Sequence, residues 1–380
     1  MKLSSILACS LSTCMIDLSG AVPTPFTDFT NSIIWYPAAD AVSWHTLYAR
    51  PLQLPDESLI ITWENYPLEP PLVNHPILRS VDGGATWTNY SAINDQVNGW
   101  GMRFQPFLYT LPQQLGDFPA GTILASGVSS PSNLTGGVYI ELYASVDNAQ
   151  TFDFVSHIAW GAGPQRVSDG SFALWEPFLT VYENQLVCFF SDSRDPSHSQ
   201  KLSYATSSDL RTWSDEVDAV VYQTYEDRPG MPTVAYIATT GRYILTYEYC
   251  GAEGCGIFYR LSTSPLTFSD AGDNIVSPAG TVPSSLGGNP YMIWTEHPDQ
   301  TDGSGLLILS AGGQEEVYLN DDAAGATSWR PADVGMWSAY SRGLSIISVN
   351  GRKKLQFANG GNMGDPNDNS IATGIVEVPT

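Results

Sequence analysis

The stretch S-V-D-G-G-A-T-W at residues 80–87 recurs as S-V-D-N-A-Q-T-F at residues 145–152 and, shortened, as S-S-D-L-R-T-W at residues 207–213. Weaker copies end at Phe268 and Trp329, and the closing aromatic residues of the five copies are 65, 61, 55 and 61 residues apart. In such a turn Asp accepts hydrogen bonds from exposed N–H groups, Gly or Asn tolerates a positive φ, and the aromatic residue packs beneath. The spacing therefore predicts one supersecondary unit per copy.

Pairs of apolar runs accompany these turns, and each pair is separated by a turn of its own. In E-P-F-L-T-V-Y-E-N-Q-L-V-C-F-F, a polar residue and a Pro open the first run, and a short turn leads into the second. Runs of this kind predict β-strands, and no helical periodicity lies between them. The six pairs begin at Arg50, Gln105, Glu176, Met231, Asn289 and Ser341.

The number of pairs predicts the architecture. Residues 1–21 contain Lys2, a short apolar stretch and small residues at their end, which is typical of a signal peptide. The other 380 − 21 = 359 residues give about 60 for each of six units. We predict an all-β fold over residues 22–380, a single six-bladed β-propeller with Asp-box (BNR-type) hairpin turns. We expect closure where residues 33–36 pair with the C-terminal I-A-T-G-I-V-E-V.

The predicted signal peptide implies a secreted, extracellular protein, in which disulfides can persist. Cys250 and Cys255, in C-G-A-E-G-C, could close a small loop. Cys188 lies in the apolar run L-V-C-F-F, where we expect a buried thiol.

The charge balance excludes several classes of partner. The chain has 16 Lys and Arg against 39 Asp and Glu, a formal charge of −23, which would repel nucleic acid and anionic membranes. After the signal, no apolar run approaches the length of a membrane span. The five His residues show no metal-ligand spacing, and there is no phosphate-binding loop or nucleophile elbow. We expect a monomer without a metal or a cofactor.

In a propeller, the innermost strands begin and the second strands end on one face, around the central channel. Side chains there form a concave ring, which is the first place to look for a site. Innermost strands would contribute Arg50, Gln105, Glu176, Arg228, Asn289, Tyr340 and Arg342. Second strands would contribute Glu64, Ser126, Asp192, Arg194, Glu248, Ser310 and Asn359.

Three glutamates of this ring stand among aromatic residues: Glu64 in T-W-E, Glu176 in L-W-E-P and Glu248 in T-Y-E-Y. Aromatic surroundings raise the pKa of a carboxyl group, whereas Arg50 or Arg342 nearby would lower it, and such opposed environments separate an acid from a base. Each Glu could instead be a rim residue satisfied by backbone N–H groups or Arg. Together, Glu176 and Glu248 favour glycoside hydrolysis, which uses two carboxyl groups.

Other residues could contact a sugar. His45 follows Trp44 and could donate to a substrate hydroxyl, or it could be an ordinary hydrogen-bonded surface residue. Tryptophans in connecting segments could stack on a sugar ring, although most would fill the wedge-shaped space between blades. These are Trp35, Trp44, Trp100, Trp160 and Trp337.

The chain size, the signal, and the segments A-L-W-E-P-F-L and Y-I-L-T-Y-E-Y-C resemble the fungal exo-acting arabinanases of glycoside hydrolase family 93. That family shares Asp-box turns and the six-bladed propeller with sialidases. The resemblance implies a retaining exo-α-1,5-L-arabinanase that releases arabinobiose from the non-reducing end of linear arabinan. It implies Glu248 as nucleophile and Glu176 as general acid/base. The substrate would be held by His45, Arg50, Glu64, Gln105, Asn289, Tyr340 and Arg342.

Two alternatives stay open. A sialidase-type exoglycosidase would use Arg50 in Y-A-R-P, with Arg228 and Arg342, to bind a carboxylate, although a strongly acidic protein gains nothing in attracting an anionic sugar. A noncatalytic propeller would bind sugar in the same ring without cleaving it. For exo action, the long segments at residues 65–76 and 129–137 could form walls that close one end of the site.

Overall fold

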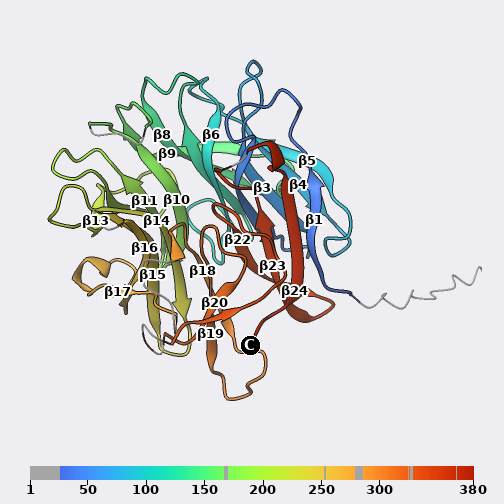
Figure 1. Ribbon diagram of the computed structural model, residues 1–380. Helices are drawn as coiled ribbons and strands as arrows, with labels where there is room; N and C mark the ends of the chain where they lie inside the picture. Colours follow the sequence, from blue (N-terminus) through green and yellow to red (C-terminus); the bar gives the residue numbers. More distant parts are fainter. Residues whose placement is uncertain are drawn as a thin grey trace, which may run out of the picture.

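The computed structural model describes residues 26–166, 170–251, 254–278, 286–323, 325, 328–364 and 366–380, so the predicted signal peptide lies outside the described residues. All strands of this described part belong to six four-stranded antiparallel sheets, arranged as the blades of a propeller (Figure 1). The predicted all-β, six-bladed propeller is thereby confirmed. Within the described ranges, no helix is long and apolar enough to cross a membrane.

The blades follow one another along the chain. Blade 1 contains β2 (Thr46–Gln53), β3 (Leu59–Asn65), β4 (His75–Ser80) and β5 (Thr88–Ile93). Blade 2 contains β6 (Met102–Thr110), β7 (Ile123–Ser129), β8 (Val138–Ser145) and β9 (Asp153–Gly161). Blade 3 contains β10 (Leu174–Tyr182), β11 (Gln185–Asp192), β12 (Lys201–Ser207) and β13 (Val217–Val220).

The second half repeats this order. Blade 4 contains β14 (Arg228–Ile237), β15 (Arg242–Gly251), β16 (Gly254–Ser262) and β17 (Asn274–Ile275). Blade 5 contains β18 (Tyr291–Glu296), β19 (Gly305–Ser310), β20 (Val317–Asp321) and β21 (Arg330–Ala332). Blade 6 contains β22 (Gly343–Val349), β23 (Arg352–Asn359), β24 (Ile371–Glu377) and β1 (Phe29–Trp35). Two short 3-10 helices are η1 (Phe268–Asp270) and η3 (Pro366–Asp368).

The ring closes in blade 6, where the two ends of the chain meet as predicted. The first strand, β1, is the outermost strand of this blade and pairs antiparallel with β24, with Ser32 opposite Thr373. Lys354 reinforces the junction because its ammonium group contacts both Asp28, at 2.8 Å, and Glu377. Through this pairing β1 covers the edge of β24 and holds the first and last strands of the described chain in one blade.

The repeated turns connect the third and fourth strands of blades 1, 2 and 3 and share one hydrogen-bonding scheme. In blade 1, Asp82 accepts hydrogen bonds from the Thr86 amide at 2.9 Å and the Thr86 hydroxyl at 2.6 Å. In blade 2, Asp147 accepts the equivalent bonds from Thr151 at 3.0 and 2.7 Å. The Asp therefore organises each turn through backbone and hydroxyl donors, as the repeat predicted.

The core consists of apolar strand faces packed between neighbouring blades. Phe107 on β6 packs on Phe178 on β10 with ring centroids 4.5 Å apart, which joins blades 2 and 3. Cys188 on β11 is a buried free thiol, and Cys250 and Cys255 form a disulfide across the β15–β16 hairpin. Both cysteine predictions are confirmed. The packed blades provide the rigid frame on which the central side chains stand.

Candidate active site

The innermost strands of five blades share an unusual backbone conformation at the central channel. In each of them one non-glycine residue has a positive φ, between 42° and 57°. In blades 1 to 4 this residue lies at a break in the register between the first and second strands, which marks a β-bulge. In blade 5 it precedes β18. These five bulge residues are Tyr48, Gln105, Glu176, Met231 and Asn289.

Four of the bulge residues converge through their side chains, although they come from four blades. The Tyr48 hydroxyl donates to Glu176 Oε1 at 3.4 Å and lies 3.9 Å from the sulfur of Met231. The Asn289 amide nitrogen lies 3.0 Å from the same sulfur. A left-handed residue costs roughly 1 kcal/mol or more, and such strain often accompanies a functional site. Here the bulge side chains meet at one place on the propeller axis.

A side chain from the preceding blade holds three of the bulges in place. The amide of Gln105 donates to Glu64 Oε2 at 2.9 Å, and that of Met231 donates to the Ser191 hydroxyl at 3.1 Å. The amide of Asn289 donates to Glu248 Oε2 at 3.2 Å. Glu64, Ser191 and Glu248 occupy the same register position, since each pairs with the residue just before the bulge of its own blade.

The surroundings of Glu176 favour the protonated form of its carboxyl group. Its Oε2 accepts a 2.6 Å hydrogen bond from the Ser191 hydroxyl, and its Oε1 accepts one from Tyr48. Burial raises the pKa of Glu176 to about 7, against the opposing effect of the Ser191 hydrogen bond. The negative charge of Glu248 raises this pKa further, whereas Arg228 lowers it. Glu176 is therefore a carboxyl group that can stay protonated near neutral pH.

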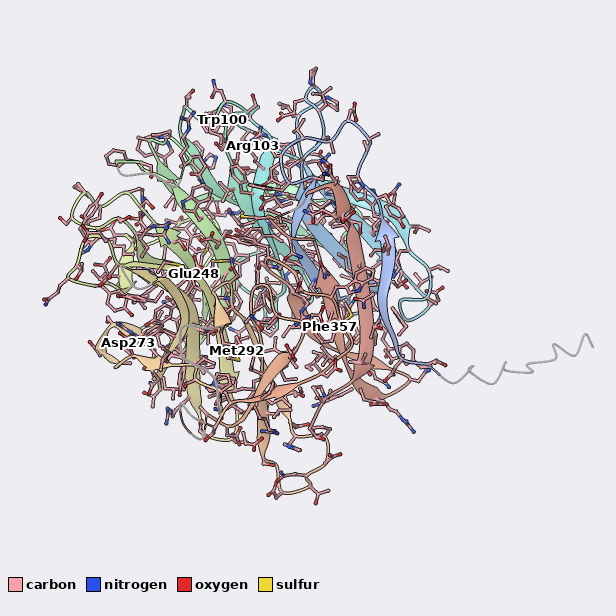
Figure 2. The ribbon with its side chains drawn as sticks, viewed as in Figure 1. Trp100, Arg103, Glu248, Asp273, Met292 and Phe357 are labelled. Atoms are coloured by element: carbon pink, nitrogen blue, oxygen red, sulfur yellow. A yellow bond between two sulfur atoms is a disulfide. The ribbon has the colours of Figure 1, made fainter. Side chains whose placement is uncertain are left out.

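Glu248 lies on β15, closer to the centre of the propeller than Asp273, which lies towards the outer edge of the same blade (Figure 2). Two glycines allow the neighbouring backbone to approach its carboxylate: a Cβ at Gly288 would lie 2.5 Å from Oε2, and one at Gly230 would lie 3.1 Å from Oε1. Burial raises the pKa of Glu248, and the Asn289 amide and the Arg228 charge oppose that rise. These two stabilise the ionised form of Glu248.

Arg228 influences both carboxyl groups, and its position is controlled by Gln200. The Arg228 guanidinium donates to Gln200 Oε1 at 2.9 Å, and Gln200 Nε2 donates to the Pro229 carbonyl at 2.9 Å. Gln200 is almost fully buried. This amide therefore fixes the cation beside the two glutamates.

Two phenols complete the centre of the site. The ring of Tyr340, just ahead of β22, meets the ring of Tyr48 edge to face with centroids 5.6 Å apart. Burial and the charges of Glu248 and Glu176 raise the pKa of the Tyr340 hydroxyl, so it stays a neutral hydrogen-bonding group. Asn289 also bonds to the Tyr340 side chain. Tyr340 and Asn289 thus lie beside the carboxyl pair, and their contact with substrate stays a prediction.

Glu64 lies in the same group of side chains at the propeller axis, but both oxygens of its carboxylate already accept hydrogen bonds from the protein. One oxygen accepts from the Gln105 amide, and the other accepts from the Tyr66 hydroxyl. Burial raises the pKa of Glu64 to about 7. Glu64 therefore secures the bulge of blade 2 rather than presenting a free carboxylate. His45 lies in the loop before β2 and is partly exposed, and its carbonyl accepts the Tyr66 amide at 3.1 Å.

Arg50 and Arg342 have different surroundings from those we expected. Arg50 is buried between the rings of Tyr48 and Tyr291 and donates to the carbonyls of Ala49 and Ser341 and to the Ser341 hydroxyl. Arg342 is 1% exposed and donates to the Ser310 hydroxyl and to the carbonyls of Glu315, Glu316 and Trp337. Both guanidinium groups join neighbouring blades, Arg50 through its bonds to Ser341 and Arg342 through its bonds to Ser310 and to the carbonyls of Glu315 and Glu316.

The channel below the carboxyl groups is nearly closed. A cavity of about 20 Å³ remains there, lined by Arg50, Gln105 and Glu176 and by the prolines that follow four of the bulge residues. Gln105 thus lies at the floor of the site. Among the described residues, no group of three or more His, Cys, Asp or Glu could hold a metal ion.

Two long loops rise beside the site, and one arginine joins them. Arg103 donates to Glu69 Oε1 at 2.6 Å in the loop of residues 65–76 and to the Ser130 carbonyl at 3.1 Å in the loop of residues 129–137. The guanidinium also donates to the Trp100 carbonyl, and the labels of Arg103 and Trp100 lie together at the top of Figure 2. The loops that we predicted as walls are therefore fastened to each other.

Sequence reasoning missed Tyr48 and Ser191, and it named Met231 only as the start of an apolar pair, with Arg228 in its place in the ring. It took Arg50 as the start of the first inner strand, whereas β2 starts at Thr46 and the equivalent position is Tyr48. A signal for Met231 was present, because the bulge residues of blades 2 to 5 all directly precede a Pro. No comparable signal marked Tyr48, since the nearest following Pro is three residues further on.

The solved structures that resemble the chain along nearly its whole length include those of two fungal enzymes. The α-L-arabinanase of Penicillium chrysogenum, complexed with arabinobiose, is 38% identical with a TM-score of 0.85, and the match covers 92% of this chain and 98% of that one. The GH93 α-L-arabinofuranosidase of Fusarium graminearum, with arabinobiose, is 39% identical with a TM-score of 0.86 over the same shares. No protein-family model and no curated protein matches the chain.

Sialidases share the fold alone. The NanB sialidase from Streptococcus pneumoniae is 10% identical with a TM-score of 0.56, covering 92% of this chain and 71% of that one. The arabinan-related enzymes are similar in sequence as well as in fold, over almost the full length of both chains. This chain therefore belongs to glycoside hydrolase family 93.

Proposed function

We propose that this protein is a retaining exo-α-1,5-L-arabinanase that releases arabinobiose from the non-reducing end of linear arabinan. The observation that carries the proposal is the pair Glu176 and Glu248 at the propeller axis. The charge of Glu248 raises the pKa of Glu176, whereas the Asn289 amide stabilises the ionised form of Glu248. The two fungal relatives bound to arabinobiose support the choice of sugar.

In the proposed reaction, Glu176 donates its proton to the glycosidic oxygen while ionised Glu248 attacks the anomeric carbon. The C–O bond to the leaving chain breaks, and a covalent glycosyl–enzyme ester forms. Glu176, now ionised, then removes a proton from a water molecule, which attacks the anomeric carbon and releases Glu248. The environments suit these roles, since the Asn289 amide stabilises the anion of Glu248 and burial favours the protonated form of Glu176.

The two arginines argue against a sialidase. Recognition of a sialic acid carboxylate would need guanidinium groups that are free to form bidentate contacts with it. Arg50 and Arg342 are buried and donate to carbonyls and serine hydroxyls of the protein itself. A neutral furanoside needs no such cation cluster.

The disulfide supports the proposal that the chain is secreted. Disulfides are typical of proteins in oxidising compartments, and Cys250 and Cys255 are bonded. The hairpin they join continues the strand of Glu248, so the bond also stabilises one side of the site. The monomeric state stays a prediction.

Product analysis tests the proposed function directly. Incubation with debranched linear arabinan should yield arabinobiose as the dominant product from the first minutes, and a fluorogenic sialoside should stay intact. Mass spectrometry of the products and proton NMR of the newly formed anomer provide the readouts, and the first anomer released should have the α configuration. Random oligomers, an inverted anomer, or hydrolysis of the sialoside alone would each reject the proposal.

Variants of the two glutamates separate their roles. Glu248→Ala and Glu176→Ala should each lower kcat on arabinan by about 10³-fold or more. With an activated aryl arabinobioside, azide should rescue Glu248→Ala to give an inverted glycosyl azide and Glu176→Ala to give a retained one, because only Glu248 forms the ester. The exchanged pattern would reverse the assignment. Arabinan binding by both Gln variants, with no hydrolysis by wild type, would identify a noncatalytic sugar-binding protein.

The pH profile of kcat/KM should be bell-shaped. Activity rises as Glu248 ionises, above the usual range of a glutamate because burial raises its pKa, and falls as Glu176 loses its proton near pH 7. With a dinitrophenyl leaving group, which needs no proton, the fall near pH 7 should disappear. Glu64 has a similarly raised pKa, so Glu64→Gln serves as the control and should retain the fall. If the fall in kcat/KM near pH 7 were absent in Glu64→Gln, that fall would have to be assigned to Glu64 instead of Glu176.

A further inference from the structure

The two tyrosines that flank Glu248 in the segment T-Y-E-Y do not surround its carboxylate. Successive side chains of a strand point to opposite faces, so Tyr247 and Tyr249 lie on the face of β15 opposite Glu248. Glu248 faces blade 5, where it accepts the Asn289 amide. The tyrosines face the chain that connects blade 3 to blade 4, residues 221–227, and contact it. The mechanism above uses neither of them.

A carboxylate anchors the first of these tyrosines. Tyr247 is fully buried, and its hydroxyl donates to Asp273 Oδ1 at 2.6 Å. The hydroxyl of Tyr222 donates to the other oxygen of Asp273 at 3.0 Å, and the two hydroxyl oxygens lie 2.9 Å apart. Although burial raises the pKa of Asp273, its hydrogen bonds with Arg260 and Tyr247 lower it below the usual value. Hydrogen bonds to an ionised carboxylate are roughly twice as strong as those between neutral groups, so Asp273 holds Tyr247 firmly.

A second carboxylate anchors the other tyrosine. The Tyr249 hydroxyl donates to Asp227 Oδ1 at 2.7 Å. A Cβ at Gly251 would lie 2.9 Å from each of these two oxygens, so the glycine leaves the room that this bond needs. Asp227 directly precedes Arg228, the cation that lowers the pKa of both glutamates. The strand is thus anchored at both neighbours of Glu248.

These bonds join the two blades that carry the proposed catalytic pair. Tyr222 and Asp227 follow β13, the outermost strand of blade 3, whereas the groups they bond to lie in blade 4. Arg260 on β16 also crosses to blade 3, where it donates to the carbonyl of Ala219 on β13 at 3.3 Å. The acid/base stands in blade 3 and the nucleophile in blade 4. A shift of one blade against the other would therefore change the distance between the two carboxyl groups.

We propose that Asp273 and Asp227 are positioning residues of the reaction. They act through Tyr247 and Tyr249, which hold β15 so that the carboxylate of Glu248 reaches the anomeric carbon. This inference rests on the proposed function. In this role neither aspartate contacts the substrate. Misplacing a reacting group by about 1 Å can lower a rate by about 10²-fold, so a weakened anchor lowers kcat more than it lowers affinity.

Removal of one hydroxyl group tests this role. Tyr247→Phe should lower kcat on linear arabinan about 10-fold and change KM by less than about 2-fold, because the nucleophile is less well placed. The loss should persist with the dinitrophenyl leaving group, since a better leaving group replaces a missing proton but not a displaced nucleophile. Tyr249→Phe should change kcat in the same direction. Asp273→Asn/Tyr247→Phe should lose no more than Asp273→Asn alone, because both changes break one anchor.

Tyr204→Phe is the matched control. Tyr204 on β12 is buried, and its hydroxyl donates to the Leu266 carbonyl at 3.0 Å, so it joins blade 3 to blade 4 through a bond that does not involve β15. Its kcat should equal that of wild type, whereas its Tm should fall about as much as that of Tyr247→Phe. An unchanged kcat in Tyr247→Phe, a higher KM without a loss of kcat, or an equal loss in Tyr204→Phe would overturn the proposal.

Amide exchange separates this inference from the proposed function. The Asn289 amide is bonded to Glu248, so its hydrogen exchange reports how firmly that carboxylate is held, without any substrate. The exchange rate, followed by NMR on the full chain, should be about 10-fold higher in Tyr247→Phe and unchanged in Tyr204→Phe. If wild type cleaves no arabinan, the proposed function fails, and this measurement still decides whether the anchors hold Glu248. An equal rate in wild type and Tyr247→Phe rejects them.

Discussion

The site depends on hydrogen bonds that cross from one blade to the next at the propeller axis. The amides of three left-handed bulge residues, Gln105, Met231 and Asn289, donate to side chains at the same register position of the preceding blade. A left-handed residue has a conformational cost that the surrounding structure must offset. The blade-to-blade bond does this, and it brings side chains from different blades together over a nearly closed channel floor.

Glu248 combines this structural position with chemistry. In blade 3 the equivalent residue is Ser191, a neutral acceptor, and in blade 1 it is Glu64, whose second oxygen is bound by Tyr66. Glu248 accepts the Asn289 amide through one oxygen only. The amide that stabilises the bulge of blade 5 therefore also stabilises the carboxylate that must be ionised for attack. Glu176 differs because it is itself a bulge residue, buried and close to the charge of Glu248. One repeated framework thus creates two unequal carboxyl groups.

Much of the fold could be predicted from the sequence because it repeats. The Asp-containing turns and the paired apolar runs are local features, and their number predicts six blades. Three glutamates could be placed in the ring because they stand at predicted strand starts or ends among aromatic residues, and the resemblance to family 93 selected Glu176 and Glu248 from them. Side-chain roles that depend on hydrogen-bond partners were harder to predict. Arg50 and Arg342 were expected at the substrate, but they donate to carbonyls of neighbouring blades, which sequence does not reveal. Tyr48 was missed because, unlike the bulge residues of blades 2 to 5, it does not directly precede a Pro, and the Pro of its strand follows Arg50 instead.

The most direct test of the carboxyl pair is covalent trapping of the nucleophile. An arabinofuranose-configured epoxide, which retaining enzymes open by attack of their carboxylate, should add one inhibitor mass to the intact protein. Peptide mapping should place that mass on Glu248, and arabinobiose should protect against labelling. A label on Glu64 or Glu176, or an active enzyme that never becomes labelled, would contradict the assignment of Glu248 as the nucleophile and Glu176 as the proton donor.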